Sequence, residues 1–388
     1  MKEPKIRLKG FTGEWNETTI GEIAAFSKGR GYSKSDLKTQ GNPIILYGRL
    51  YTNYASTIKE VDTFATLQKG SVLSKGNEVI IPASGETPED IAIASYVQQQ
   101  GVILGGDLNV LTFDSTKINP AFAAIGISNS KTHTELSGYA QGKSVVHLHN
   151  GNIAKGHLTY PSVEEQESII SYINSLDSLI QSTTKKIESL KQVKAASLQS
   201  MFPQEGETTP RVRFKGFTGD WEKSTFGELL IFERPDNYIV SNDVYSDEFS
   251  TPVLTANKGF ILGYTNERRT FNSPCIIFDD FTLDSKFVDF PFMVKSSALK
   301  ILTLRNEKKD SLYFVYTLLK QTKIEVLGHA RHYISVVQPT QVYMPKDSTE
   351  QKMIASFFSN LDSQIALLAQ QLEKLQQIKS ACLDNMFV

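Results

Sequence analysis

The sequence predicts an α+β protein in which two mixed α/β globular domains are separated by two long antiparallel coiled-coil helices, in a pseudo-two-fold duplicated architecture. Three observations predict this fold. A helical segment occurs twice, at about 163–201 and 348–386, a short motif begins each half, and strand-like runs bounded by turn residues fill the regions between. The chain therefore consists of two copies of one long repeat, and each copy contains a motif, a variable region and a helix in that order.

The helical segment repeats with an offset of 185 positions. Apolar residues step by three and four in both copies, as at Ile169, Ile173 and Leu176 in the first. Such a seam keeps one stripe facing a partner helix, which is the pattern of a coiled coil. Five residues of the first copy are identical to their counterparts 185 positions later. They are Gln166, Asp177, Lys194, Met201 and Phe202, which correspond to Gln351, Asp362, Lys379, Met386 and Phe387.

The two helices are predicted to pack against each other. A serine precedes an acidic or amide-rich first turn in both, Ser162 and Ser348, and we expect these serines to be the caps. Each helix would be about 57 Å long, too long to be stable alone. Antiparallel packing would hold the globules at a fixed distance and place Val388 near Met1. Polar residues that interrupt the seam are expected to fix its register: Thr183, Lys194 and Lys379.

The second duplication is the opening motif of each half. RLKGFTGEW at 7–15 returns as RFKGFTGDW at 213–221, with an offset of 206. A polar linker with proline at both ends precedes the second copy, so it separates helix from globule. We divide the chain into a first globular domain (1–160), a first spacer helix (161–202), the linker (203–210), a second globular domain (211–344) and a second spacer helix (345–388).

The variable regions of the two globules show little likeness to each other. Each contains one short helical candidate, at 120–128 and at 311–321. The strand-like runs are 43–47, 78–82, 101–104 and 109–113 in the first region, and 274–278, 292–294 and 299–304 in the second.

Composition excludes several protein classes. Lys+Arg (41) and Asp+Glu (42) nearly cancel, so any anion-binding face must be local. Two distant cysteines, Cys275 and Cys382, fit a reducing compartment without a disulfide framework. No apolar run approaches a membrane span, and the first residues lack the apolar core of a signal peptide. We expect a soluble cytoplasmic protein that does not enter the membrane.

Catalytic signals are poor. The stretch 138–144 resembles a phosphate loop but has three residues between its glycines where four are needed. Asp280, Asp284 and Lys286 could imitate the carboxylates and lysine of a metal nuclease, yet the first globule has no counterpart. The six histidines have no metal-ligand spacing, and no base-methylation motif or dinucleotide fingerprint is present. We expect a non-catalytic chain without a metal.

Loops that mix cations, hydroxyls, amides and aromatics indicate DNA binding, because such side chains contact phosphates and base edges. Two late loops share a framework, GYAQ at 138–141 and GHAR at 328–331, but differ at the tip, where glutamine prefers adenine and arginine prefers guanine. The candidate DNA-binding residues are Lys28, Arg30, Tyr32, Tyr47, Arg49, Ser84, Glu86, Thr87, Gln141 and Lys143 in the first globule, and Lys258, Arg268, Arg269, Thr282, Lys286, His329, Arg331, His332 and Tyr333 in the second.

Several motifs together resemble the DNA specificity (S) subunit of type I restriction-modification systems. They are the opening motif and its repeat, LQSMF at 198–202, IPASGETPEDI at 81–91 and FDDFTLDSKF at 278–287. The likeness covers essentially the whole chain.

The resemblance implies a function. Each globule would be a target recognition domain that reads one half of a bipartite, asymmetric site in double-stranded DNA, and the helices would set the spacer. Two modification subunits would dock on the helices, which we expect near Gln166, Asp177, Gln351 and Asp362, and restriction subunits would join for ATP-dependent cleavage. S-adenosylmethionine, ATP and Mg²⁺ would belong to the partners, with no cofactor in this chain.

Two rival hypotheses stay open. A stand-alone nuclease or methyltransferase would modify or cleave DNA without partners. A coiled-coil scaffold, or an antagonist that mimics an S subunit, would bind partners with no sequence preference for DNA.

Overall fold

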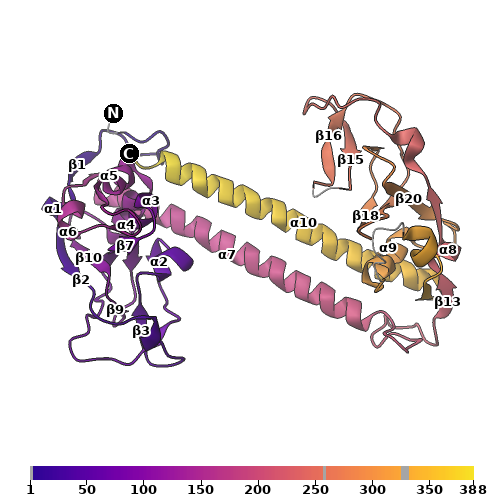
Figure 1. Cartoon of the computed structure of the whole chain (residues 1–388), viewed down its shortest axis with the longest axis horizontal. Coiled ribbons are helices and arrows are strands. Elements are labelled where there is room, and N and C mark those ends of the chain that lie inside the picture. The colour runs from indigo at the N-terminus through magenta and orange to yellow at the C-terminus, as the bar shows by residue number, and fades with distance from the viewer. Residues whose placement is uncertain (1–2, 257–258, 325–331) are drawn as a thin grey trace. The chain divides into compact units, whose positions relative to one another are not determined.

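The computed structural model describes residues 3–256, 259–324 and 332–388 (Figure 1). The chain divides into two compact units. The first consists of Met1–Thr184 with Gln371–Val388, and the second is Lys185–Gln370. Each unit therefore contains one globule and a part of both long helices.

The first unit is built on β-sheets. Within its described residues, a five-stranded sheet has the order β2-β10-β6-β8-β4 and a three-stranded sheet has the order β5-β3-β9, while β1 pairs with β12 and β7 with β11. The strands are β1 (Asn16–Thr19), β2 (Ala24–Lys28), β3 (Asn42–Ile45), β4 (Thr57–Ile58), β5 (Phe64–Ala65), β6 (Glu78–Pro82), β7 (Ser84–Gly85), β8 (Ser95–Val97), β9 (Ile103–Leu104), β10 (Leu108–Phe113), β11 (Val146–His147) and β12 (His157–Tyr160).

Short helices complete this unit. The expected helix at 120–128 is present as α4, and its first turn is capped by Asn119. The helix α5 was not predicted, because it buries only Thr132 and Leu136 and so lacks an apolar stripe. The helices are α1 (Ile20–Ile23), α2 (Arg49–Thr52), α3 (Pro88–Ile91), α4 (Pro120–Asn129), α5 (Lys131–Tyr139) and α6 (Asn150–Ile153), with a 3-10 turn at Lys34–Asp36.

The second unit has a sheet of order β14-β20-β17-β18, a smaller sheet β16-β15-β19 and the pair β13-β21. Its strands are β13 (Glu222–Thr225), β14 (Leu230–Glu233), β15 (Thr251–Leu254), β16 (Ile261–Thr265), β17 (Cys275–Asp279), β18 (Ser285–Val288), β19 (Met293–Val294), β20 (Leu299–Leu304) and β21 (Gln341–Met344). Its short helical elements are α8 (Phe226–Leu229), a 3-10 turn at Pro235–Tyr238, α9 (Leu312–Gln321) and a π-helix at Tyr333–Val337.

Continuous apolar runs form the central strands, as expected for strands with neighbours on both sides. Every residue of β6 and of β17 is buried. The runs predicted at 78–82 and 274–278 therefore lie in the middle of their sheets. The run predicted at 101–104 is shorter than expected, since only Ile103–Leu104 pairs as β9.

The two long helices are α7 (Val163–Ser200) and α10 (Ser348–Asn385). The Ser162 hydroxyl accepts the Glu165 N–H at 3.4 Å, as predicted for a cap. The predicted cap at Ser348 is wrong by one residue. The helix already includes Ser348, and the Asp347 carboxylate accepts the Thr349 N–H at 2.7 Å. Among the described residues, none of the helices has the length and apolar content needed to cross a membrane.

The helices run antiparallel, as the packing within each unit shows. In the first unit the amino end of α7, at Ile169 and Ile173, packs in one cluster with Met386 and Phe387, which directly follow the carboxyl end of α10. In the second unit the roles are exchanged, and Phe202, just after α7, packs against Phe358 of α10 at 5.8 Å between ring centroids. Each long helix thus begins in one unit and ends in the core of the other.

Residues near the two ends of the chain meet in the first unit, as antiparallel packing predicts. The Ile6 N–H donates to the Asn385 carbonyl at 2.9 Å. Val388 packs with Leu8 against the same apolar cluster.

Candidate nucleic-acid interface

The opening motif of each half is joined to the start of a long helix by a bidentate ion pair. Arg7 donates to both carboxylate oxygens of Glu165 at 2.8 Å, and Arg213 donates to both of Glu350 at 2.7 Å. The glutamates are almost fully buried, and their hydrogen bonds with the guanidinium groups raise the pKa of both arginines. Two unlike globules are therefore held to their helices by one duplicated joint.

Two glutamines that mark the expected docking positions on the helices belong to these joints. Gln166 is 0% exposed, and its amide accepts the Asn119 N–H at 2.8 Å and donates to two carbonyls at 2.9 Å. Gln351 is 1% exposed and accepts the Ser311 N–H at 3.1 Å. Because these amides are buried and satisfied, neither side chain can itself contact a partner, and docking near them would use other residues of the helices.

Reciprocal ion pairs link the long helices. Lys194 of α7 binds Asp362 of α10, and Asp177 of α7 binds Lys379 of α10, each with 2.5 Å between nitrogen and oxygen. Thr183, the third polar residue of the seam, is 7% exposed. The carboxylates expected near a partner surface are therefore already paired between the helices. This arrangement fits the predicted role of seam polar residues in register.

In the first globule the fold brings Ser84 and Gln141 together, although 57 positions separate them. Ser84 lies opposite His147 in the pairing of β7 with β11. Gln141 lies opposite His147 on the other side, where the Gln141 N–H donates to the His147 carbonyl at 3.0 Å and the His147 N–H donates back at 2.7 Å. We name β7, β11 and Gln141 the recognition ribbon.

Buried and tight contacts hold this ribbon. The side chain of Asn109, 0% exposed, donates to the carbonyls of Leu148 at 2.8 Å and Pro82 at 3.3 Å, so it joins the two chain segments beside the ribbon. The Tyr51 hydroxyl donates to the Ser84 carbonyl at 2.8 Å. Gly142 has φ +134°, and an added Cβ would lie 2.0 Å from the Val145 carbonyl oxygen, so the turn requires glycine.

Other predicted residues of the first globule have structural partners. Arg49 pairs with Asp62, and the Thr87 hydroxyl caps α3 by accepting the Asp90 N–H at 3.1 Å. The Tyr32 hydroxyl lies 2.6 Å from the Ser71 hydroxyl. The remaining predicted side chains are wholly or partly solvent-accessible: Lys28, Arg30, Tyr47, Glu86 and Lys143.

In the second globule a carboxylate builds the turn between β17 and β18. Asp279 accepts the Phe281 N–H at 2.9 Å and the Thr282 hydroxyl at 2.6 Å. Asp284 binds Lys320 at 3.0 Å and Lys286 at 3.8 Å. Burial acts to raise the pKa of Asp284, but the hydrogen bond from Lys320 and the two ammonium charges outweigh it and lower that pKa.

Asp280 is not free to act with Asp284 and Lys286 as a metal-binding triplet. It is 2% exposed and binds the equally buried Lys300 at 3.2 Å. It also accepts the Tyr333 N–H at 2.8 Å. Among the described residues, no cluster of three potential His, Cys, Asp or Glu metal ligands occurs.

The prediction that His332 and Tyr333 contact DNA differs from the structure, because both side chains are 0% exposed. His332 Nδ1 lies 3.1 Å from the Asp280 carbonyl, and the Tyr333 ring packs on Phe278 at 5.5 Å. The predicted residues Lys258, His329 and Arg331 lie outside the described residues.

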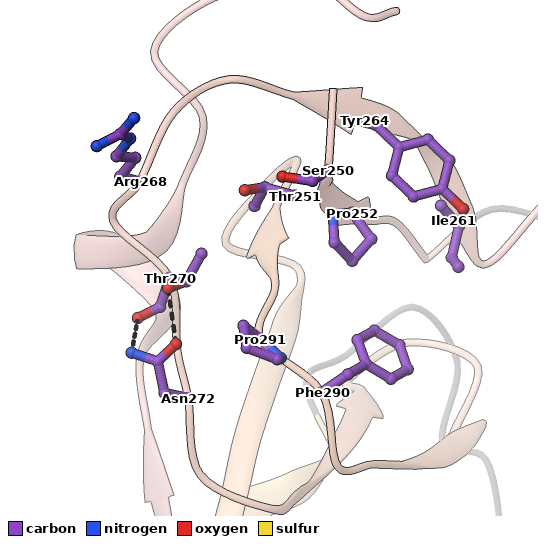
Figure 2. A pocket seen from close by; sticks show the side chains of 10 residues that line it. All are labelled: Ser250, Thr251, Pro252, Ile261, Tyr264, Arg268, Thr270, Asn272, Phe290 and Pro291. Atoms are coloured by element: carbon purple, nitrogen blue, oxygen red, sulfur yellow. Dashed lines mark hydrogen bonds between the residues drawn. The ribbon is translucent and has the colours of Figure 1, made fainter. Parts of the chain in front are cut away.

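A surface hollow of about 610 Å³ lies beside β15 and β16 (Figure 2). Figure 2 shows Tyr264 and Phe290 on one side of it and Arg268 on the other, with Thr270 and Asn272 hydrogen-bonded to each other. The fold thus gathers aromatic rings, hydroxyls and the predicted Arg268 around one hollow, whereas Arg269 is exposed but does not line it. Such side chains contact nucleic-acid backbones and base edges.

Comparison with known families identifies the duplicated design. The family described as "Type I restriction modification DNA specificity domain" matches residues 12–192 and again 218–377. The chain belongs to this family. The two matched stretches cover most of both globules and most of both long helices.

Individual proteins are also similar to this chain. The specificity subunit of the Escherichia coli type I restriction enzyme EcoR124I/EcoR124II is 40% identical over 135 residues, which are 33% of this chain and 33% of that relative. The crystal structure of the S subunit of a type I restriction-modification system from M. genitalium aligns over 100% of this chain and 99% of its own, with a TM-score of 0.71 and 14% identity. The HsdS subunit from Thermoanaerobacter tengcongensis aligns over 100% and 99% with a TM-score of 0.46 and 14% identity.

Proposed function

We propose that the chain is the DNA-reading subunit of a cytoplasmic type I restriction-modification complex. Each globule reads one half of a bipartite, asymmetric site in double-stranded DNA. The long helices set the spacer between the halves and dock two modification subunits, which methylate adenine. With restriction subunits added, the partners cleave DNA at the cost of ATP.

The duplicated joints carry this proposal. Arg7 with Glu165 and Arg213 with Glu350 attach the globules to the helices in the same way, while the sheets beyond these joints have different strand orders. Two identical attachments to the long helices, each carrying a different globular domain, are the arrangement that a protein recognising two different half-sites requires. The equivalent helices offer two modification subunits equivalent surfaces.

We propose that the chemistry belongs to the partners. The carboxylates that most resemble a nuclease centre are engaged, Asp280 with Lys300 and Asp284 with Lys320. S-adenosylmethionine, ATP and Mg²⁺ are accordingly expected on the modification and restriction subunits.

DNA contacts are proposed on the exposed candidates. In the first globule these are the partly exposed Ser84 with Gln141 and Lys143 of the recognition ribbon and its turn, together with the exposed Lys28, Arg30, Tyr47 and Glu86. In the second globule they are Arg268, Arg269, Thr282 and Lys286. With a net charge of −1, part of the phosphate contact must come from the partner subunits.

Methylation sequencing of DNA from cells that express the chain with its modification subunits tests the proposal. A bipartite methylated motif that disappears without this chain is expected. Methylation at sites without a common motif, or an unchanged motif in the absence of the chain, would contradict it. Cleavage or methylation by the purified chain alone would overturn its non-catalytic role.

A further inference from the structure

We infer that His147 is the central base-reading residue of the first half-site and acts in a row with Ser84 and Gln141. This inference rests on the proposed function, since it assigns a specificity-determining side chain within the recognition ribbon. The sequence alone does not single out His147, because Ser84 lies far from it along the chain and only strand pairing brings the two together.

The row follows from strand pairing. Ser84 and Gln141 both lie opposite His147, one on each side, and residues directly opposite in antiparallel pairs project from the same face. Gln141 and His147 are exposed, and Ser84 is partly exposed. Neighbouring strands lie about 4.8 Å apart, so three such side chains span about 10 Å. That span equals about three base-pair steps of 3.4 Å, and the major groove admits a β-ribbon.

The imidazole is oriented for reading. Its Nδ1 lies 3.1 Å from the Ser84 hydroxyl, which fixes the ring and leaves Nε2 as the outer polar atom. The ring of His149 stacks against it, with 6.2 Å between centroids and 2° between planes. When Ser84 donates to Nδ1, Nε2 carries the proton and donates to an acceptor such as guanine N7 or O6, adenine N7 or thymine O4.

The flanking side chains complement this group. The Gln141 amide both donates and accepts, and so can pair with the N6 and N7 atoms of adenine. Lys143, exposed in the Gly142 turn, provides a charge for phosphate at the end of the ribbon. The row therefore combines an imidazole, a hydroxyl and an amide for base edges with an ammonium group for the backbone.

The ribbon is rigid enough to hold the row in place. Leu148, next to His147, donates its N–H to the Ala83 carbonyl at 3.1 Å, next to Ser84, and the buried Asn109 side chain binds the Leu148 carbonyl. These bonds lie within the chain itself, so they fix the backbone that carries the three side chains. Preorganised contacts favour specificity because less freedom is lost on association.

Three substitutions of His147 separate reading from support. His147→Asn keeps a polar group near the Nδ1 position for Ser84 but none at Nε2; His147→Gln places an amide near the Nε2 position; His147→Ala removes both. The full chain is tested with its modification subunits. The readouts are the methylated motif and the methylation rate on duplexes that carry each base pair in turn at every first-half-site position. His157→Ala is the matched control, since His157 is an exposed histidine of the same globule that pairs with Glu135.

His147→Ala and His147→Asn are expected to lose discrimination at one or two base pairs of one half-site by about 5- to 100-fold. His147→Gln should retain discrimination or change the preferred base there. The other half-site and the His157→Ala control should be unchanged, and thermal unfolding of each variant shows whether it is folded.

Two outcomes would contradict the inference about His147 and leave the proposed function of the chain unaffected. In one, all three variants give the wild-type bipartite motif at wild-type rates. In the other, His147→Asn restores wild-type base preference, so that His147 only supports the ribbon. A wild-type complex that shows no bipartite motif would instead overturn the proposed function. If His147→Ala does not fold, the comparison of the asparagine and glutamine variants still decides the question.

Discussion

Lys194 of α7 and Asp362 of α10 form an ion pair that the hydroxyl of Tyr313 completes, since it donates to the other carboxylate oxygen at 2.7 Å. Burial and the bond to Asp362 raise the pKa of Tyr313 well above its ordinary value. Among the residues that the structure describes, no tyrosine hydroxyl donates to the duplicate pair, Asp177 with Lys379. The Asp177–Lys379 pair thus joins only the two long helices, whereas the Lys194–Asp362 pair, through Tyr313, also joins the helices to the second globule.

Asp362→Ala should therefore destabilise the fold more than Asp177→Ala. Because both carboxylates are about one-third exposed, we expect about 1–2 kcal/mol for Asp362, which loses two partners, and under about 1 kcal/mol for Asp177. Denaturant unfolding of the two variants measures this difference. Equal losses, or a larger loss at Asp177, would show that the Tyr313 bond contributes nothing. Tyr313→Phe should remove the difference.

Gln166→Leu should cost about 2–3 kcal/mol, because it leaves the Asn119 N–H and two carbonyls without their side-chain partner in a buried joint. Gln192→Leu, an exposed glutamine later in the same helix, is the control and should stay within about 0.5 kcal/mol of wild type. Unfolding free energies from urea titration decide the matter. If the Gln166→Leu variant is as stable as the wild type but does not bind modification subunits, Gln166 contributes to partner binding and not to the stability of the joint.

A circularly permuted chain should fold and read the same DNA motif. A short linker joins Val388 to Met1, and new ends are opened between Glu205 and Gly206, which are both exposed. The hydrogen bond from Ile6 to Asn385 places the old ends close together. Circular dichroism and methylation sequencing are the measurements. New ends within β6, which is buried throughout, serve as the negative control and should prevent folding.

Lengthening both long helices by one heptad should widen the spacer of the DNA target. A heptad preserves the seam, and seven residues add about 10 Å, which is about three base pairs. The insertions are placed between Thr183 and Lys194 and at the matching point of α10, so both ion pairs survive. Methylation sequencing should recover unchanged half-sites with a longer gap. Changed half-sites with an unchanged gap would mean that the helices do not set the spacing.

The frame was predictable because its signals are local and repeated. The apolar residues Ile169, Ile173 and Leu176 follow a seven-residue repeat, and the same pattern returns 185 positions later. This is enough to predict two packed helices. The apolar runs within β6 and β17 were likewise predictable, since strands buried on both faces are mainly apolar, although each of these two also carries one buried carboxylate, Glu78 or Asp279. Helix α5 was missed because its buried face consists of Thr132 and Leu136 alone.

The candidate interface was predictable only in part, because burial and pairing depend on residues distant in sequence. His332 and Tyr333 have the polar character of a reading loop, yet Asp280, more than fifty positions earlier, binds them in the core. Gln166 and Gln351 were recognised as a repeated pair, but only the fold shows that their amides are buried in the joints.

By itself the sequence determined the two repeated long helices, the two unlike globules and the family resemblance, because periodicity and repetition are properties of the chain alone. Tertiary structure decided which polar side chains support the frame and which face solvent. It also placed Ser84, His147 and Gln141 in one row, since hydrogen bonding between strands, and not position along the chain, sets which side chains become neighbours.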